Sequence, residues 1–424
     1  MKRIVAVIAM VLLLGLSGIP VARAQGKNVE LRFLSLMREP NITAEDTIIK
    51  KFEQKHPNIK VSVERVPFNE LFRKIATAVA SGDPPDVMLI DGPLTSSYAF
   101  HGVLLPLNKY YTADDLSDFL PSSLMEGTYK GTLYSVPQSQ AALALFYNTE
   151  MFKKAGIQPP KDLAEAWTWP VALEMLKKVT VDSNNDGIPE VWGISDPYEH
   201  SFFSAGQFIR SNATPGSPAF ELLSDDGTTV SGYLDAPEVI EAMQFYQDMH
   251  LKWKVKPQKE TQDMFWNGKS ATMIRSAIGV GIAANYPNIP WSVTPLPYFK
   301  TGFTHTGAFH YAVAAKTKHP DEAALLLKFL VDKENAVTYS QITASLPARK
   351  SAYARLAVYD TFPLSLFRQT LAQWGYPRPS TPAYREYESI LTETIRNIAQ
   401  GADVRASLKS AVARINLELK KYSK

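Results

Sequence analysis

The sequence predicts an α/β protein built on a parallel, doubly wound sheet. Two observations support this class. Short apolar strand patterns alternate with amphipathic helical patterns over residues 29–91, and a second set of such elements follows after residue 143. This alternation is typical of parallel strands joined by crossover helices. The chain has 424 residues, enough for two domains at the usual ~100–200 residues each.

The first elements follow from periodicity. Residues 29–34 and 59–63 alternate between apolar and polar side chains, as half-buried strands do, and residues 86–90 form the apolar run of a buried strand. Between these strands, residues 43–55 and 69–80 place their apolar side chains on one helical face. Further strands are predicted at 143–147, 271–274 and 312–315, and further helices at 149–155, 168–179, 236–250, 261–266, 320–331 and from 384 to the end.

The N-terminus has the three parts of a secretory signal peptide. Lys2 and Arg3 precede an apolar run over residues 4–16, and Ala22 and Ala24 supply the small residues of a cleavage site. The run is shorter than the roughly 20 apolar residues that span a bilayer. We expect residues 1–24 to be a signal peptide that is removed after Ala24.

The composition excludes several kinds of site and one class of partner. The absence of cysteine excludes disulfides, thiolate metal sites, a cysteine nucleophile and a lipid-modified cysteine at the signal junction. We therefore expect a free, monomeric protein in the periplasm. The formal charge of +3 includes three basic residues of the signal segment, so the mature chain is neutral and nucleic acid is not an expected partner.

Each catalytic or cofactor motif that the sequence resembles lacks a required residue. The run from Gly279 to Ala284 matches a dinucleotide fingerprint but lacks the acidic residue about 20 positions later. Residues 268–270 resemble the end of a P-loop, but Asp263 stands where its first glycine is needed. The mature chain has no H-E-x-x-H and no G-x-S-x-G motif. The sequence thus predicts a binding protein, with a secreted hydrolase as the alternative from another class.

One loop has the spacing of a calcium site. Oxygen ligands are available at loop positions 1, 3, 5, 7 and 9, from Asp182, Asn184, Asp186, Ile188 and Glu190. Gly187 at position 6 permits the sharp bend of a calcium loop, but Gly193 replaces the bidentate glutamate of position 12. Two interpretations stay open, a structural Ca²⁺ and a plain turn rich in Asp and Asn. No cofactor is required by the sequence.

Four segments stand in a fixed order along the chain. They are residues 31–91 with Ser81-Gly82-Asp83-Pro84-Pro85, residues 129–160 with Tyr147-Asn148, residues 265–273 with Trp266-Asn267-Gly268, and residues 307–348 with Leu346-Pro347-Ala348. Together they resemble the family of extracellular solute-binding proteins that includes maltose-binding protein. The resemblance covers nearly the whole mature chain.

The resemblance implies two α/β lobes joined by a hinge, with ligand bound in the cleft between them. The N-terminal lobe would comprise residues 25–136 and 304–344, and the C-terminal lobe residues 137–303 and 345–424. The implied function is that of an ABC importer receptor, which captures a mono- or oligosaccharide and delivers it to a membrane permease. A glycerol phosphate or another sugar phosphate is the alternative cargo, because Arg38, Arg275 and Arg349 could form a cationic site.

Ligands of open α/β sheets bind beyond the carboxyl ends of the strands, which singles out the residues after the first and third strands. Carried over from the family, the predicted ligand-binding residues are Arg38, Glu39, Asp91, Gln138, Gln140, Phe203, Trp266, Arg275, Ser276, His310 and Arg349. Trp167 and Trp169 are rivals for stacking on a sugar. The adjacent Tyr110 and Tyr111 suit an iron site, but we interpret them as a surface pair.

Overall fold

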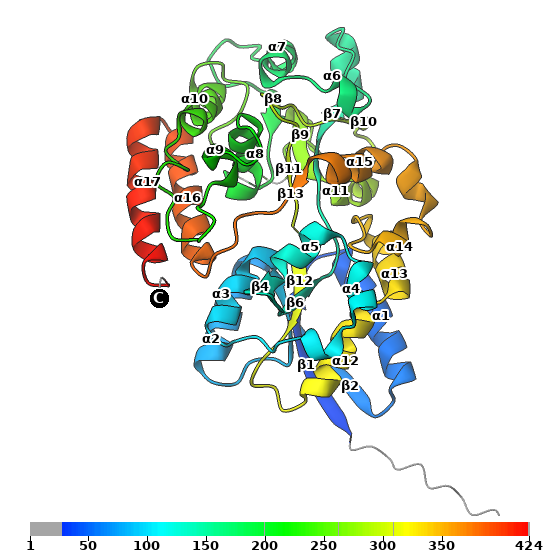
Figure 1. The fold of residues 1–424 in the computed structure, drawn as a ribbon. Coiled ribbons are helices and arrows are strands. Elements are labelled where there is room, and N and C mark those ends of the chain that lie inside the picture. Colours follow the sequence, from blue (N-terminus) through cyan, green and yellow to red (C-terminus); the bar gives the residue numbers. More distant parts are fainter. Residues whose placement is uncertain (1–27, 199, 262, 308, 423–424) are drawn as a thin grey trace, which may run out of the picture.

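The computed structural model describes residues 28–198, 200–261, 263–307 and 309–422. The predicted signal peptide lies outside the described residues. Figure 1 shows two lobes, one above the other, joined by several chain segments. The first lobe is built on a five-stranded sheet in the order β2-β1-β3-β12-β6, and the second on a four-stranded sheet in the order β10-β7-β9-β8.

The first three strands form the predicted parallel sheet. β1 (Val29–Leu36) pairs in parallel with β2 (Ile59–Val66) and with β3 (Val87–Asp91). The connecting helices are α1 (Asn41–Lys55) and α2 (Phe68–Ala80). β2 and β3 lie on opposite sides of β1, so right-handed crossovers place the two helices on opposite faces.

The rest of this sheet is not parallel, which corrects the predicted all-parallel arrangement. β12 (Phe309–Val313) runs antiparallel to both β3 and β6 (Ser135–Pro137). The physical reason is the path of the chain. β12 enters the sheet from the second lobe at the edge where β3 ends, so it must run back along β3. β6 ends at that same edge and leaves for the second lobe.

The core of the first lobe explains its sequence pattern. The four residues Val87 to Ile90 have no exposed surface, because β3 is central and both of its faces are covered. α12 (Pro320–Leu330) packs against β12, and α13 (Lys333–Thr343) packs against α1. These helices therefore return to the first lobe after the chain has passed through the second.

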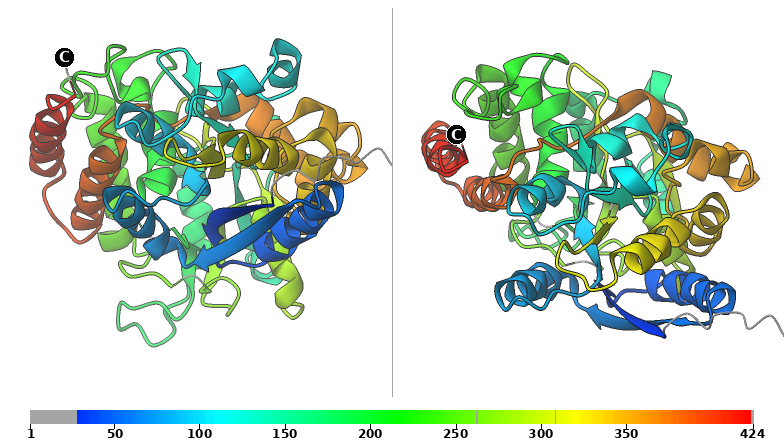
Figure 2. Two further views of the ribbon diagram at one scale, coloured as in Figure 1. Left: turned by 90° about the horizontal axis from the view of Figure 1, so that it is seen from below. Right: turned by 60° about the horizontal axis from the view of Figure 1, so that its bottom comes forward.

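The second lobe is a mixed sheet surrounded by helices. β7 (Leu143–Asn148) pairs antiparallel with β9 (Ser270–Ser276) and β10 (Trp291–Thr294), and β8 (Trp192–Ser195) pairs in parallel with β9. Its helices are α6 (Thr149–Lys154), α7 (Trp169–Val179), α8 (Phe202–Ser211), α9 (Pro218–Glu221), α10 (Pro237–Leu251), α11 (Ile278–Ile282), α14 (Lys350–Tyr353), α15 (Leu364–Trp374), α16 (Tyr384–Ala399) and α17 (Val404–Leu419). Figure 2 shows α16 and α17, in red, side by side at one end of the molecule.

The chain passes between the sheets three times: between β6 and β7, between β10 and β12, and after α13. The lobe boundaries that the resemblance implies, at residues 136/137, 303/304 and 344/345, stay a prediction. The remaining short elements are η1 (Gly92–Leu94), α3 (Thr95–Phe100), η2 (Asn108–Tyr110), α4 (Ala113–Ser117), α5 (Pro121–Glu126), β4 (Thr128–Tyr129), β5 (Thr132–Leu133), η3 (Leu163–Glu165), η4 (Ala283–Asn285), β11 (Thr304–His305), η5 (Ala357–Asp360) and β13 (Gly375–Tyr376).

Two predicted helices differ from the structure. In the described part of residues 261–266 the chain forms turns that close at Gly268, whose φ of 70° favours glycine. The predicted C-terminal helix is two helices, and the chain turns at Gly401, whose φ of 106° favours glycine. Among the described residues, no helix is long and apolar enough to cross a membrane.

Candidate ligand-binding site

An exposed apolar surface lies at the carboxyl edge of the first sheet. Met37 follows β1, Phe68 follows β2, and Phe309 begins β12 opposite Asp91. We name Phe68 and Phe309, together with the neighbouring Met37, the aromatic platform. Phe68 is 53% exposed and Met37 is 59% exposed, while the Phe68 and Phe309 rings lie 6.1 Å apart between centroids. Clustered exposed apolar side chains mark binding surfaces in soluble proteins.

Arg38 completes this edge. Its guanidinium lies 5.5 Å from the centre of the Phe309 ring, and its Nε donates to Asn41 Oδ1 at 3.3 Å. The predicted neighbour Glu39 has a local role, because it accepts from the backbone N–H and the hydroxyl of Thr43 at the start of α1. The structure therefore brings Arg38, but not the carboxylate of Glu39, to the aromatic platform.

The second lobe offers a matching edge where β8 and β9 end. Tyr198 follows β8, and its hydroxyl lies 3.3 Å from the Oγ of Ser276 at the end of β9. Its ring packs edge-on against Phe203, with 5.2 Å between centroids. Arg275 precedes Ser276, and its buried Nε has no hydrogen-bond partner. Two predicted residues, Phe203 and Ser276, thus contact an aromatic residue that the sequence did not single out, whereas the Arg275 side chain lies on the other face of β9, near Phe146.

Arg378 joins the two lobes. Its Nη1 and Nη2 donate to the two carboxylate oxygens of Asp91 at 2.8 and 2.6 Å, and its guanidinium lies 5.5 Å from the centre of the Phe203 ring. The side chain is 5% exposed. Burial opposes the charged form, but Asp91, with Tyr384 and Glu388, holds the pKa of Arg378 well above its usual value. A bidentate pair of this kind is rigid and directional.

Other contacts continue this connection along η1 and α3. The Ser96 hydroxyl donates to the carbonyl of Thr381 at 2.8 Å, and Leu94 is buried in the hydrophobic core of the second lobe. The Phe100 ring lies 5.1 Å from the ring of Tyr422, just after α17. The end of β3 and the helix that follows it are therefore the part of the first lobe that the C-terminal helices touch.

Two predicted residues organise the passages between the lobes. The amide of Gln140 donates to Ser123 Oγ, and its oxygen accepts the N–H of Gly307 at 3.1 Å. His310 is fully buried, with Nδ1 2.9 Å from Ser135 Oγ and Nε2 3.6 Å from Glu126. A Cβ atom on Gly307 would stand 2.9 Å from Glu126 Oε1. The glycine therefore lets the buried Glu126 approach the crossing strand.

A cavity adjoins these passages. It has a volume of about 290 Å³ and lies between α5 of the first lobe and residues 221–225 and 376–380 of the second. Glu126, Arg210 and Arg378 line it. Burial lowers the pKa of Arg210 to about 10, and three aromatic rings surround its guanidinium. The cavity is therefore a polar space between the two lobes, beside the chain segments that connect them.

Other predicted ligand contacts have packing roles. Gln138 is buried and donates to Glu45 Oε1 at 3.1 Å inside the first lobe. Arg349 pairs with Asp118 at 3.2 Å and lies 3.9 Å above the Phe119 ring. Trp266 is 3% exposed and stacks on Tyr286. These side chains occupy the interior because neighbouring elements cover them, which short sequence motifs do not reveal.

The two tryptophans predicted as alternative stacking residues are also covered by neighbouring side chains. Trp169 has no exposed surface and stacks on Phe208 at 4.2 Å between centroids. Trp167 is partly buried against two hydrophobic clusters of the second lobe. No contact of either tryptophan with Tyr198 or Ser276 is seen among the described residues, so a stacking role for them stays a prediction.

The predicted calcium loop forms a turn closed by its own side chains. Asp182, Asn184, Asp186 and Glu190 each accept a backbone N–H of the loop. One oxygen of Asp182 is buried without a partner. Within the described residues, no group of three or more His, Cys, Asp or Glu side chains is arranged to hold a metal ion. Bound calcium stays a prediction.

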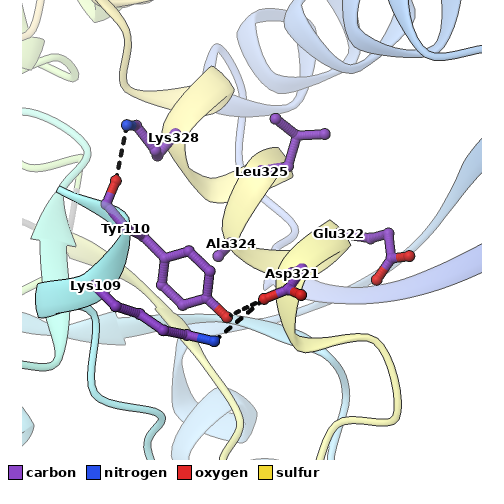
Figure 3. A pocket seen from close by; sticks show the side chains of 7 residues that line it. All are labelled: Lys109, Tyr110, Asp321, Glu322, Ala324, Leu325 and Lys328. Atoms are coloured by element: carbon purple, nitrogen blue, oxygen red, sulfur yellow. Dashed lines mark hydrogen bonds and ion pairs between the residues drawn. The ribbon is translucent and has the colours of Figure 1, made fainter.

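A shallow groove of about 470 Å³ lies on the first lobe between η2 and α12 (Figure 3). The Tyr110 hydroxyl and Lys109 Nζ meet at Asp321, and Lys328 donates to the Tyr110 carbonyl. Tyr111 is buried in the core of the lobe. The two adjacent tyrosines therefore point to different surroundings and do not form a common ligand set.

Sequence comparison identifies the family. The profile of the bacterial extracellular solute-binding proteins matches residues 47–362. A putative binding protein of Brucella abortus is 26% identical over 392 residues, covering 89% of this chain and 90% of the relative. The periplasmic sn-glycerol-3-phosphate-binding protein of Rhizobium meliloti is 24% identical over 415 residues, covering 91% and 93%.

Solved structures share the two-lobed fold. An ABC substrate-binding protein of Listeria monocytogenes, in complex with cycloalternan, superposes with a TM-score of 0.81 at 23% identity, covering 93% of this chain and 100% of that one. The maltose/maltodextrin-binding domain of Bdellovibrio bacteriovorus, bound to maltotriose, gives 0.77 at 22% identity with the same coverage. These structures confirm the predicted fold, and the profile match shows that the chain belongs to the bacterial extracellular solute-binding protein family.

Proposed function

We propose that this protein is the receptor of an ABC importer and that it binds a mono- or oligosaccharide between its lobes. The observation that carries the proposal is that both sheets end in side chains suited to a sugar, and that Arg378 connects Asp91 at the first edge to Phe203 at the second. The first lobe contributes an exposed aromatic platform, and the second contributes hydroxyl and aromatic side chains around Tyr198. Sugars present apolar faces that aromatic rings cover and hydroxyls that polar groups bind.

The bound solute would act on the hinge. A sugar that touches both edges binds best when the lobes are close together, so binding shifts the population toward the closed arrangement. The permease then receives the closed form. This role requires no chemical change of the solute, and we propose that the protein has no enzymatic activity. The names of the sugar-bound structures support a carbohydrate ligand.

A phosphate cargo is the second candidate, and the name of the Rhizobium meliloti relative favours it. The cationic site expected for it needs Arg38, Arg275 and Arg349 together. Arg349 is 5% exposed and is committed to Asp118, so at most two of the three guanidiniums are available. A neutral sugar therefore fits the described side chains better than a sugar phosphate.

We further propose that the protein works in the periplasm as a free monomer after removal of residues 1–24. The missing cysteine supports a free protein, and the extracellular character of the family supports export. Calcium in the Asp182–Glu190 loop remains a separate hypothesis, which calorimetric titration of Ca²⁺ into chelator-treated protein would test.

A thermal-shift screen tests the cargo. Protein without residues 1–24 is heated with maltotriose, mannobiose, tagatose, galacto-oligosaccharides, glycerol 3-phosphate and amino acids. A solute that binds only the folded state stabilises it by mass action, by about 2.7 kcal/mol when the free solute is at 100 times its Kd. The midpoint temperature of unfolding therefore rises. We expect a sugar to give the largest shift. A shift with glycerol 3-phosphate alone would replace the sugar with a phosphate cargo.

A further inference from the structure

A buried charge cluster lies behind the loop that carries Tyr198. Lys256 and Glu260 form an ion pair whose side chains are 1% and 0% exposed. One oxygen of the Glu260 carboxylate pairs with the Lys256 ammonium, and the other accepts the backbone N–H of Asp196. Asp196 itself is 1% exposed. Buried ion pairs are seldom needed for stability, because apolar side chains can replace them, so this one calls for a functional explanation.

The cluster reaches the predicted ligand surface through two further hydrogen bonds. Asp196 Oδ1 accepts the backbone N–H of Tyr198 at 2.9 Å. The hydroxyl of Tyr198 then lies 3.3 Å from Ser276 Oγ at the end of β9. The Glu260 carboxylate therefore fixes the backbone from which Tyr198 extends, although Glu260 is itself fully enclosed.

We propose that Glu260 is a positioning residue for solute binding: its ionised carboxylate anchors residues 196–198, and its protonation loosens this loop and weakens binding. The proposal rests on the proposed function for its consequence for affinity, but the anchoring itself does not depend on which solute binds.

The direction of the effect follows from the charges. Burial raises the pKa of Glu260 to about 7, with the ammonium of Lys256 opposing this rise and Asp196 adding to it. Above this pKa the carboxylate is ionised and accepts the Asp196 N–H as a charge-assisted hydrogen bond, which is roughly twice as strong as a neutral one. Below it, the charge is lost. The loop is thus held at pH 8 and loosened at pH 6.

Two titratable neighbours, Tyr246 and His250, do not account for this change. Burial raises the pKa of Tyr246, on α10, well above its usual value, so it stays neutral. Burial, with the charge of Lys256, lowers the pKa of His250 well below its usual value, so it also stays neutral. His200 Nδ1 lies 2.9 Å from the Tyr246 hydroxyl and Nε2 2.9 Å from the Gln258 carbonyl. These bonds do not involve Glu260 or Asp196, so replacing His200 is a control that changes a neighbouring imidazole and leaves the Glu260 carboxylate in place.

Amide hydrogen exchange tests the anchoring without any solute. Exchange at residues 196 and 198 is measured by NMR from pH 6 to pH 8 and corrected for the intrinsic rate. In the unmodified protein we expect the protection of both amides to fall roughly fivefold to tenfold between pH 8 and pH 6. Glu260→Gln should be pH-independent and weakly protected, and His200→Gln should keep the step.

A flat profile in the unmodified protein, or a step that persists in Glu260→Gln, overturns the proposal. If Glu260→Gln does not fold, the profiles of the unmodified protein and of His200→Gln decide. Calorimetry with maltotriose, or with whichever screened sugar binds more tightly, then measures Kd at pH 8 and pH 6. Weaker binding at pH 6 supports the proposal. Equal Kd values refute it and leave the proposed function intact, whereas an exchange step with no sugar binding refutes the proposed function alone.

Discussion

Replacing Phe68 by alanine is the sharpest test of the aromatic platform. The ring is 53% exposed and lies 6.1 Å from that of Phe309. A phenylalanine side chain buries about 150–250 Å² when fully covered, so roughly 100 Å² of Phe68 remains for a ligand. If a sugar covers half of this area, burial contributes about 1.3 kcal/mol at ~25 cal/mol per Å². Phe68→Ala should then raise Kd about tenfold.

Phe362 provides a matched control. It is 51% exposed and lies in the segment between η5 and α15, which contributes no residue to either edge described above. Phe362→Ala removes the same side chain with the same exposure, so it should leave Kd within about twofold. Isothermal titration calorimetry with the sugar that gives the largest thermal shift measures both variants. An unchanged Kd in Phe68→Ala, or an equal loss in both variants, would show that the platform does not contact the solute.

Three further predictions concern the ionised and aromatic contacts. Asp91→Ala leaves Arg378 buried without its main partner, so urea denaturation should show a loss of about 3–5 kcal/mol, partly restored by adding Arg378→Met. Burial raises the pKa of Glu45 to about 7, above the unfolded value, so its contribution to stability is complete below about pH 4.5 and is lost as the pH rises to about 7. Glu45→Gln should therefore gain thermal stability over the unmodified protein between pH 5 and pH 8, on the order of 3 kcal/mol; equal pH profiles would contradict this. Tyr422→Ala removes the ring contact with Phe100, about 0.5–1.5 kcal/mol, and should increase the radius of gyration of the solute-free protein in X-ray scattering.

The strands and helices could be predicted because each carries its own period. Residues 29–34 alternate as a half-buried strand, with Leu31 and Phe33 buried and Glu30 and Arg32 exposed, and the apolar run ending at Ile90 has no exposed surface. Strand direction was harder to predict. β12 looks like any other buried strand in sequence, and only its entry from the second lobe makes it antiparallel to β3.

The candidate site was only partly predictable for a related reason. Position after a strand placed Arg38 and Asp91 at the sheet edge, because that rule depends on chain order. It could not separate Trp266, which is enclosed, from Phe68, which is exposed, since both are aromatic residues near element ends. The pattern of a strand that ends at Val66 and a helix that begins at once could have pointed to Phe68.

Arg378 shows where sequence reasoning ends. It lies 287 residues from Asp91, in a segment of prolines that carries no periodic pattern, and only the packing of α16 against α3 and η1 brings the two together. Its position also bears on how the receptor closes. Moving a two-state equilibrium from 1:99 to 99:1 takes about 5.5 kcal/mol of differential binding, and the platform residue Phe68 supplies only about 1.3 kcal/mol of it by the area argument. A solute that drives such a switch would have to draw the remainder from contacts beyond Phe68, so we expect affinity to depend on both lobes and not on the aromatic platform alone.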